Sequence, residues 1–299
     1  MIVKRAAVMG RCMGVRRAVD LALAAAAKEG PQGVFTLGPL IHNPQAVAEL
    51  EAAGVRAISE AEMDGRDSTG AARVAGKTVV IRAHGVPPAL RGRLVSLGAR
   101  VVDATCPRVI ASQRKAAAYA AKGWRVVIAG DEGHGEVVGI AGHAPGAVVI
   151  GSPEEARAFD ATGPEGEELP VALIAQTTIK KEEYEAIRAV LAERFQRLEV
   201  VDSICPCTED RLSALTKLAA DVEAIVIVGG RNSANTARLL TTARELGKPA
   251  WLVETAAELP EEIFAYSSVG LSAGASTPER LIDEVEARLL LPRSTQAAD

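Results

Sequence analysis

Residues 101–107 read V-V-D-A-T-C-P, and residues 200–206 repeat the pattern as V-V-D-S-I-C-P. In each copy a short run rich in β-branched residues ends at a cysteine and a proline, and a helical pattern follows. Such a strand would deliver the thiol of Cys106 or Cys205 to the start of the next helix. Together with Cys12 near the start of the chain, the two copies suggest three thiolates that converge on one point.

Apolar runs alternate with helical patterns along the whole chain, which predicts an α/β fold with mostly parallel sheets. In each third of the chain a strand ends at a glycine, and a polar residue follows four positions later: Gly38 and His42, Gly130 and His134, Gly229 and Ser233. The intervals from the cysteines to these polar residues are 30, 28 and 28 residues. The intervals from there to the end of the last strand are 42, 43 and 43 residues, and those ends carry His84, Thr177 and Ser276.

This regularity predicts three equivalent βα modules of roughly 100 residues. We expect an N-terminal strand with the first cysteine in residues 1–13, modules in 14–105, 106–204 and 205–292, and a flexible tail in 293–299. Locally, the pattern predicts a helix from about Val15 to Lys28, a polar loop over residues 61–72 and a strand that ends at Thr177. Asn43 and Pro44 suit the N-cap and the first position of another helix.

The composition is that of an ordinary globular chain, since 24% of its 299 residues are charged and 48% are hydrophobic. A net charge of −4 argues against a general nucleic-acid binder, and an aromatic content of 3% argues against stacking on single strands. No apolar run approaches the ~18 residues of a membrane span, and the N-terminus lacks the apolar region of a signal peptide. We therefore expect a cytoplasmic protein, in which four cysteines favour metal binding or catalysis over disulfides.

Ligands of open parallel sheets bind beyond the carboxyl ends of the strands, where all of these positions are expected. Three thiolates from three modules can hold an iron–sulfur cluster or a zinc ion, although the C-x-x-C pairs usual in zinc sites are absent. Three inert buried cysteines are the alternative. A cubane cluster held by three cysteines would leave one iron open to a substrate oxygen.

Six polar residues near helix N-termini could bind an anion such as a diphosphate; they are His42, His84, His134, Ser233, Asn235 and Ser276. The alternative for each histidine is a structural role, which we assign to His143. Glu136 is the one carboxylate at its loop position, and burial beside an anion would raise its pKa so that it could supply a proton near neutral pH. An ordinary first-turn glutamate is the alternative. Thr177 could orient that proton.

Nine short motifs, spread from Cys12 to Pro278, resemble those of the 4-hydroxy-3-methylbut-2-enyl diphosphate reductase family, whose members perform the last step of the methylerythritol phosphate route to isoprenoids. They occur in the family order: R-C-M-G-V-R-R-A-V, L-G-P-L-I-H-N, I-R-A-H-G-V, D-A-T-C-P, G-H-G-E-V-V-G, Q-T-T, S-I-C-P-C-T, N-S-A-N-T-A-R-L and A-G-A-S-T-P. The resemblance implies a trefoil of three α/β modules around one 4Fe–4S cluster per chain. It implies that the cluster has three cysteine ligands, Cys12, Cys106 and Cys205, and a fourth iron open to substrate.

The resemblance also implies roles for the polar residues. Glu136 matches the family's proton donor, Thr177 matches the threonine beside the substrate, and the diphosphate-binding positions are matched by His42, His84, His134, Ser233, Asn235 and Ser276. The family performs a reductive dehydroxylation: the allylic hydroxyl binds the open iron, two electrons enter, water leaves, and protonation gives isopentenyl and dimethylallyl diphosphate. We therefore expect a small allylic diphosphate as substrate, ferredoxin or flavodoxin as electron donor, and neither a nucleic acid nor a membrane as partner.

Three positions depart from the family pattern. Arg11 stands where an aromatic residue is usual, and Ala234 stands where a second serine is common, which removes one possible phosphate donor. Cys207 stands where the family usually has a small or polar residue. As a fourth ligand it would close the open iron and leave a non-catalytic iron–sulfur electron carrier or redox sensor. We interpret Cys207 as a bystander, because a C-x-C pair is cramped and the residues just past Cys205 should already turn into a helix. That carrier is the main alternative function, and a structural zinc protein is another.

Overall fold

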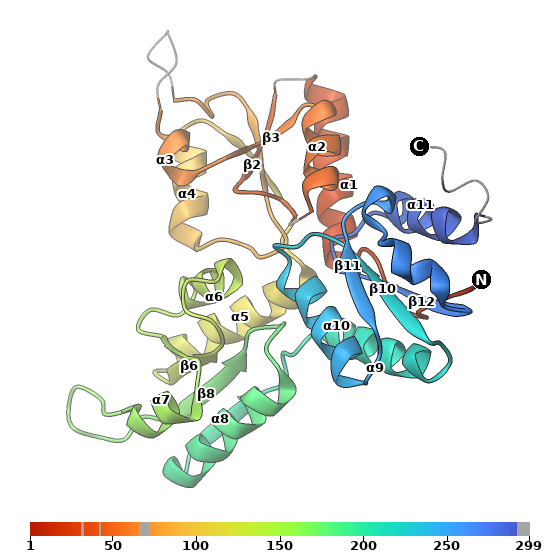
Figure 1. The fold of residues 1–299 in the computed structure, drawn as a ribbon. Coiled ribbons are helices and arrows are strands. Elements are labelled where there is room, and N and C mark those ends of the chain that lie inside the picture. Colours follow the sequence, from red (N-terminus) through yellow and green to blue (C-terminus); the bar gives the residue numbers. More distant parts are fainter. Residues whose placement is uncertain (31–32, 42, 66–71, 292–299) are drawn as a thin grey trace. The chain divides into compact units, whose positions relative to one another are not determined.

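The computed structural model describes residues 1–30, 33–41, 43–65 and 72–291, which fold into three four-stranded sheets and their helices (Figure 1). Every strand pair whose register is described is parallel. The predicted α/β class with three βα modules is therefore confirmed. The chain divides into two compact units. Unit 1 comprises Met1–Val19, Pro39–Val55 and the chain from Pro206 on, and unit 2 comprises Asp20–Gly38 and Arg56–Cys205.

The first sheet has the order β3-β2-β4-β5 and contains β2 (Val34–Leu37), β3 (Val55–Ile58), β4 (Thr78–Ile81) and β5 (Arg100–Asp103). The second has the order β7-β6-β8-β9 and contains β6 (Arg125–Ala129), β7 (Val148–Ile150), β8 (Val171–Ala175) and β9 (Leu198–Val201). The third has the order β1-β12-β10-β11 and contains β1 (Ile2–Arg5), β10 (Ala224–Val228), β11 (Ala250–Val253) and β12 (Ser268–Ala273).

The helices before β6 are α1 (Met13–Glu29), α2 (Pro44–Ala52), α3 (Glu60–Met63), α4 (Pro88–Ser96) and α5 (Pro107–Ala121). Those that follow are α6 (Gly135–Ala141), α7 (Pro153–Ala158), α8 (Lys181–Arg194), α9 (Pro206–Ala220), α10 (Ala234–Glu245) and α11 (Glu279–Leu290). Two short 3-10 helices, η1 (Ala256–Glu258) and η2 (Glu261–Ala265), lie between β11 and β12.

The three sheets share one topology, which is the structural basis of the sequence repeat. In the first two sheets, the first strand along the chain pairs with the second and the third, and the fourth pairs with the third. In the third sheet β10, β11 and β12 take the first three places, and the N-terminal strand β1 takes the fourth by pairing with β12. Each predicted ligand cysteine follows a fourth-place strand: Cys12 follows β1, Cys106 follows β5 and Cys205 follows β9.

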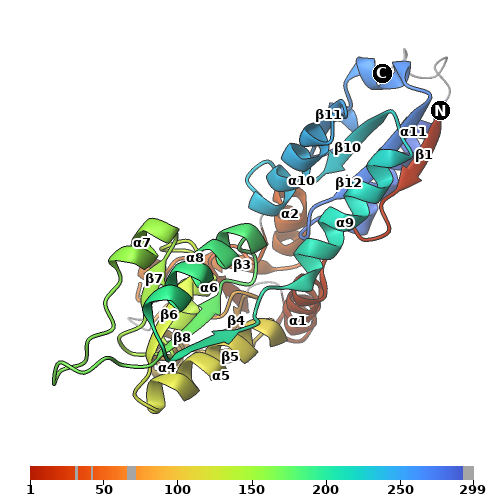
Figure 2. The same cartoon turned by 90° about the horizontal axis from the view of Figure 1, so that it is seen from below.

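The second and third sheets are each covered by helices on both faces, because successive side chains of a strand point to opposite faces. On β6, Val127 packs in a core that includes Ile187 of α8, whereas Ile128 packs in a core that includes Ile140 of α6. In the third sheet, α11 covers one face while α9 and α10 cover the other (Figure 2). Because β8 and β10 are buried along their whole length, their carboxyl ends are rigid supports for the residues that follow.

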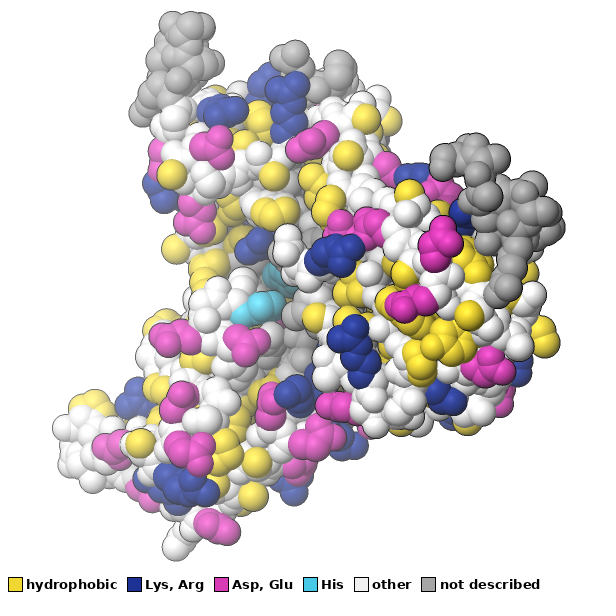
Figure 3. Space-filling model, viewed as in Figure 1, with side chains coloured by type: hydrophobic (Ala, Val, Ile, Leu, Met, Phe, Trp, Pro, Cys, Tyr) yellow, Lys and Arg dark blue, Asp and Glu magenta, His cyan; other side chains and the backbone are white. Residues whose placement is uncertain are grey.

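Charged side chains of both signs are interspersed on the face drawn in Figure 3. In unit 1, Arg5 of β1 pairs with three carboxylates of α11, Glu279, Asp283 and Glu286. Exposed ion pairs contribute little one by one, but this network fastens β1 to α11. Within the described ranges, no helix combines the length and the apolar content needed to cross a bilayer.

Several element boundaries differ from the sequence-based expectations. The predicted start of α2 is confirmed, since the side chain of Asn43 accepts a hydrogen bond from the backbone N–H of Ala46. The loop expected over 61–72 is wrong at its start, where α3 forms because Ser59 and Glu62 make a capping box; residues 66–71 lie outside the described ranges. β8 ends two residues before Thr177, because the N–H of Thr177 bonds a side chain instead of continuing the ladder. α1 is slightly longer than the expected helix at both ends.

Replacement of Asn43 by alanine should lower the free energy of unfolding by about 1 kcal/mol. The substitution removes the buried oxygen that accepts the N–H of Ala46 at 2.9 Å. The matched control Asn43→Ser keeps a capping oxygen and should stay close to the parent chain. Urea-induced unfolding followed by circular dichroism measures both variants, and equal stability of Asn43→Ala and the parent would show that other contacts fix the start of α2.

Candidate active site

The three cysteines predicted to bind a cluster occupy equivalent places in the three repeats. All three are free thiols of intermediate exposure, and each precedes a helix. Their backbone N–H groups donate to the turn after a third-place strand: Cys106 to Ala83 O at 2.9 Å, Cys205 to Thr177 O at 2.8 Å, and Cys12 to Ala275 O at 3.2 Å. Each cysteine is therefore fixed at or next to a predicted substrate-binding position, which is His84, Thr177 or Ser276.

A buried carboxylate lies at the centre of the group in unit 2. Glu136 is 2% exposed and Thr177 is 6% exposed. The backbone N–H of Thr177 donates to Oε1 of Glu136 at 2.6 Å, and its hydroxyl donates to Oε2 at 2.8 Å. Burial raises the pKa of Glu136, and the two hydrogen bonds from Thr177 oppose this shift without cancelling it. Glu136 therefore keeps its proton to a higher pH than an exposed glutamate does, which suits a proton donor.

Two predicted anion ligands, His84 and His134, lie against each other in the same unit. Their ring centroids are 5.1 Å apart in an edge-to-face arrangement. His134 is the N-cap of α6, and its Nδ1 accepts a hydrogen bond from the N–H of Glu136 at 3.2 Å. A ring nitrogen that accepts carries no proton, so we infer from this bond that His134 presents a proton on Nε2.

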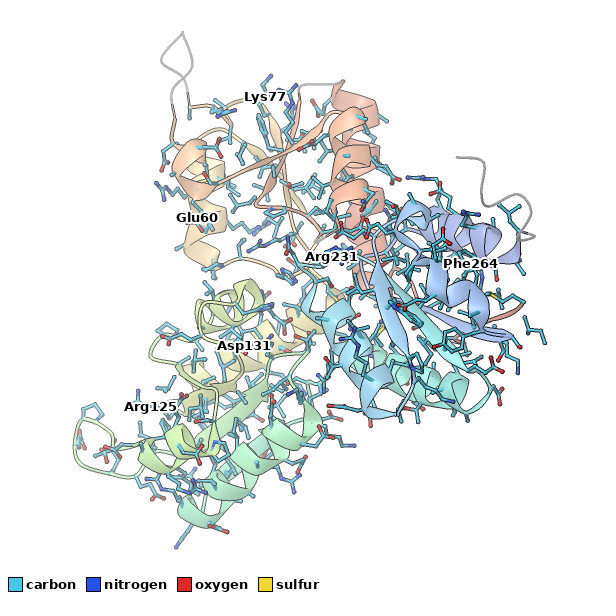
Figure 4. All side chains as sticks on the ribbon, in the orientation of Figure 1. Glu60, Lys77, Arg125, Asp131, Arg231 and Phe264 are labelled. Carbon is cyan, nitrogen blue, oxygen red and sulfur yellow. The ribbon has the colours of Figure 1, made fainter. Side chains whose placement is uncertain are left out.

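Gln176 positions this group, although the sequence analysis did not assign it a role. Its Oε1 accepts a hydrogen bond from the N–H of Asp131 at 2.8 Å, and its Nε2 donates to the Asp131 carboxylate at 3.3 Å. These bonds tie the loop after β6, where Figure 4 labels Asp131, to the end of β8. Gly130 leaves room for the amide, since a β-carbon there would lie 2.6 Å from Gln176 Oε1. The sequence feature that could have pointed to Gln176 is its place directly after an apolar run.

The other described candidates gather in unit 1. Ser233 is the N-cap of α10, and Asn235 accepts a hydrogen bond from the N–H of Ala275 at 3.0 Å. The carbonyl oxygen of Ala275 also accepts the N–H of Cys12. One turn therefore lies next to Asn235, Cys12 and Ser276. Within the described part of the chain, the buried hydroxyl of Ser276 has no hydrogen-bond partner, which fits a group that binds a ligand oxygen.

The structure thus brings the candidates together as two groups. Unit 2 holds Cys106, Cys205, His84, His134, Glu136 and Thr177, and unit 1 holds Cys12, Ser233, Asn235 and Ser276. His42 lies outside the described residues. The convergence of all three thiols stays a prediction from the sequence, as do the module boundaries.

Cys207, one of the departures from the family pattern, lies beside Cys12 in unit 1. It is the second residue of α9, and its thiol is a neighbour of the Cys12 thiol. The proximity of Cys207, together with burial, raises the pKa of Cys12. Arg211 also contacts Cys207, with Nη1 at 3.3 Å from Sγ. Cys207 is therefore a neighbour of a predicted ligand rather than a remote thiol.

The variant Glu136→Gln should make the free energy of unfolding less dependent on pH. An unfolded glutamate loses its proton near pH of about 4.3, whereas folded Glu136 keeps it to higher pH because it is buried. The folded chain then binds more protons in that interval, so its stability falls as pH rises from about 4.3 through the folded-state pKa. Glutamine removes this loss.

Urea unfolding of the parent and the variant, below pH ~4 and above pH ~7, measures the effect. The exposed Glu132 of the same loop provides the control Glu132→Gln, which should follow the parent at both pH values. If the parent and Glu136→Gln show the same pH dependence, the pKa of Glu136 is not raised.

Known proteins match the chain almost end to end. The sequence profile of the LytB protein family matches residues 3–290. A 4-hydroxy-3-methylbut-2-enyl diphosphate reductase of Treponema denticola is 49% identical over 97% of this chain and 99% of its own length. The protein of that name from Aquifex aeolicus is 37% identical over 94% of this chain and 93% of its own length.

Solved structures agree with the sequence comparison. One solved structure is that of (E)-4-hydroxy-3-methyl-but-2-enyl diphosphate reductase, described as the terminal enzyme of the non-mevalonate pathway. It has a TM-score of 0.73 at 36% identity and covers 97% of this chain and 99% of that chain. The Plasmodium falciparum reductase has a TM-score of 0.82 at 23% identity over 98% of this chain and 89% of that chain, which supports the fold alone. With a profile match over nearly all its residues and relatives of this similarity, the chain belongs to the LytB family.

Proposed function

We propose that the chain is a 4-hydroxy-3-methylbut-2-enyl diphosphate reductase. It removes the allylic hydroxyl of this substrate reductively and gives isopentenyl diphosphate and dimethylallyl diphosphate. The observation that carries the proposal is the buried Glu136–Thr177 pair in a chain of the LytB family. A carboxylic acid whose pKa burial raises keeps its proton to higher pH than an exposed one, which suits the donor that such a protonation needs. The names of relatives up to 49% identical support the substrate.

One 4Fe–4S cluster per chain is the proposed cofactor, and the donor set fits it. Cys12, Cys106 and Cys205 are free thiols, their backbone N–H groups are held in equivalent ways, and cysteine thiolates are the usual ligands of such clusters. When bound by three cysteines, the cluster supplies electrons and one open iron for the substrate hydroxyl. The proposed source of the electrons is a ferredoxin or a flavodoxin.

The polar groups of both units are the proposed diphosphate ligands: His42, His84, His134, Ser233, Asn235 and Ser276. His134 offers the proton on Nε2, and Ser276 offers a buried hydroxyl without another partner in the described ranges. Such donors bind the oxygens of a phosphate group through charge-assisted hydrogen bonds. These contacts would orient the reacting end of the substrate, and correct positioning lowers the activation free energy of the reaction.

The hydrogen bonds of Glu136 decide where its proton resides. Oε1 faces the backbone N–H of Thr177, which can only donate, so Oε1 has to accept. Oε2 faces the Thr177 hydroxyl, which can either donate or accept. When Glu136 carries a proton, we therefore expect it on Oε2, where the bond to Thr177 would reverse so that Oγ1 accepts and directs the proton. Thr177 is in turn fixed by the bond from the Cys205 N–H to its carbonyl oxygen.

A non-catalytic electron carrier or redox sensor is the second candidate, and the contact between Cys207 and Cys12 is the observation in its favour. A carrier, however, has no use for a buried acid or for donors that suit a diphosphate. Anaerobic spectroscopy separates the two functions. The cluster signal of a reductase changes when the allylic diphosphate is added, and a signal that ignores the diphosphate contradicts the reductase.

Turnover should fall by a factor of about 100 or more in Glu136→Gln, because the variant lacks the proposed proton source. Iron content, cluster signal and substrate binding should persist, since glutamine keeps the shape of the side chain and an oxygen for the Thr177 N–H. The measurement is anaerobic turnover of the allylic diphosphate with a strong one-electron donor. Glu132→Gln is the control and should retain full activity, and near-normal turnover of Glu136→Gln would assign the proton to another group.

A further inference from the structure

Arg82 is a half-buried cation that has no hydrogen-bond or ion-pair partner among the described residues. It directly follows β4 and precedes His84 by two residues. Among residues 1–30, 33–41, 43–65 and 72–291, no acceptor bonds its buried Nε, and no carboxylate forms an ion pair with it. Glu60, labelled in Figure 4, acts on its charge only through space. Burial lowers the pKa of Arg82, which reflects the cost of holding this charge away from water.

Two glycines leave room for the guanidinium of Arg82. A β-carbon at Gly135 would lie 2.5 Å from Nη2, and a β-carbon at Gly38 would lie 2.9 Å from Nη1. Gly135 stands between His134 and Glu136, so the cation lies directly against the segment that carries both residues. Neither Nη atom is among the buried unpaired atoms, so both remain accessible to a ligand.

We propose that Arg82 is a further residue of the substrate site and binds a diphosphate oxygen through its Nη atoms. The proposal rests on the proposed function. The physical reason is that a guanidinium stays charged at neutral pH. A diphosphate carries several negative charges at that pH and gains most from a fixed cation with a planar pair of donors. Charge that is unpaired in the free chain is then neutralised in the complex.

The test uses the cluster-loaded chain and inorganic diphosphate as the probe. Arg82→Gln should weaken diphosphate binding, measured by calorimetry at neutral pH, by about tenfold or more. It should raise KM for the allylic diphosphate by a similar factor while kcat changes little, because the lost contact is with the non-reacting end of the substrate. Arg82→Lys keeps the charge but not the paired donors, so its affinity should lie between those of the parent and Arg82→Gln.

The control is Arg91→Gln, which alters an exposed arginine of α4 and should bind diphosphate like the parent. Parent-like binding and KM in Arg82→Gln would overturn the role of Arg82 and leave the proposed function intact. If the parent chain itself neither binds diphosphate nor turns over the substrate, the proposed function fails instead. A fall in kcat alone, with unchanged diphosphate affinity, would also contradict a binding role.

A separate observation concerns the thiol pair in unit 1. The thiols of Cys12 and Cys207 are neighbours, and the side chain of Arg211, which is 2% exposed, contacts both segments that carry them. Nη1 of Arg211 lies 3.3 Å from Cys207 Sγ, and Nη2 donates to the carbonyl of Gly10 at 2.6 Å. One buried side chain thus joins the first turn of α9 to the loop that carries Cys12.

We infer that Cys12 and Cys207 form a reversible disulfide in the cluster-free chain. With a peroxide as oxidant, the two thiols lose two protons and two electrons, the sulfur–sulfur bond forms, and hydrogen peroxide becomes two water molecules. A dithiol reductant reverses the reaction by exchange. Since a disulfide sulfur is no longer a thiolate, Cys12 cannot serve as a cluster ligand until the bond is reduced. The inference rests on the proposed ligand set, in which Cys12 belongs to the cluster and Cys207 does not.

The test oxidises the cluster-free chain with hydrogen peroxide, blocks the remaining thiols by alkylation and identifies linked peptides by mass spectrometry. The expected product links Cys12 to the peptide with Cys205 and Cys207, and two of the four thiols remain. Cys207→Ser should abolish this link, whereas Cys205→Ser should keep it. The oxidised parent should take up iron and sulfide only after reduction, and Cys207→Ser should take them up without it. Four reactive thiols after oxidation, or a link that survives in Cys207→Ser, would overturn the inference.

Discussion

The backbone hydrogen bond donated by each predicted ligand cysteine organises the candidate site. In every repeat the N–H of the cysteine that follows a fourth-place strand reaches the turn after the third-place strand. The backbone thereby holds a cysteine close to a polar residue of the same repeat. Backbone bonds of this kind do not depend on side-chain identity. The three turns can therefore carry histidine, threonine and serine with similar backbone hydrogen bonding.

The proposed chemistry depends on the charge states of Glu136 and Arg82, which this geometry controls. Glu136 is buried, and within the described residues its carboxyl is bonded by the N–H and the hydroxyl of Thr177, both neutral. Neutral donors favour the ionised carboxyl less than a cation would, so burial prevails and the pKa of Glu136 is raised. Arg82, by contrast, lies against Gly135, and among the described residues no carboxylate forms an ion pair with it. The same short segment thus carries an acid with a raised pKa and lies against a cation without an ion-pair partner in the described ranges, as the proposed function requires.

The sequence predicted what depends on repetition and long patterns. The constant intervals between cysteines, loop residues and last strands reflect a shared strand order, and the buried strands β6, β8 and β10 are recognisable as apolar runs. The edge strands β3, β7 and β11 escaped prediction, because each has only three or four residues and one or two of them are buried. Periodicity has too few positions to act on in such segments.

In the site, the sequence located Glu136 and Thr177 through their places in the repeat, but it could not reveal that they bond each other. The contacts of Gln176, Cys207 and Arg82 depend on tertiary packing, so their residue types alone could not reveal them. In particular, the sequence suggested that Cys207 would be a bystander because a C-x-C pair is cramped. Only the folded chain reveals that its neighbour is Cys12 from the far end of the sequence.

The place of β1 has a consequence for the order in which the protein is made. Cys106 and Cys205 bond to Ala83 and Thr177, which leave the ribosome before them, so these two anchors can close during synthesis. Cys12 bonds to Ala275, and β1 pairs with β12. The first strand to be synthesised can therefore pair only after one of the last has been made. The first thiol to emerge is the last to be anchored, and a chain that stalls before β12 lacks the partner strand it needs.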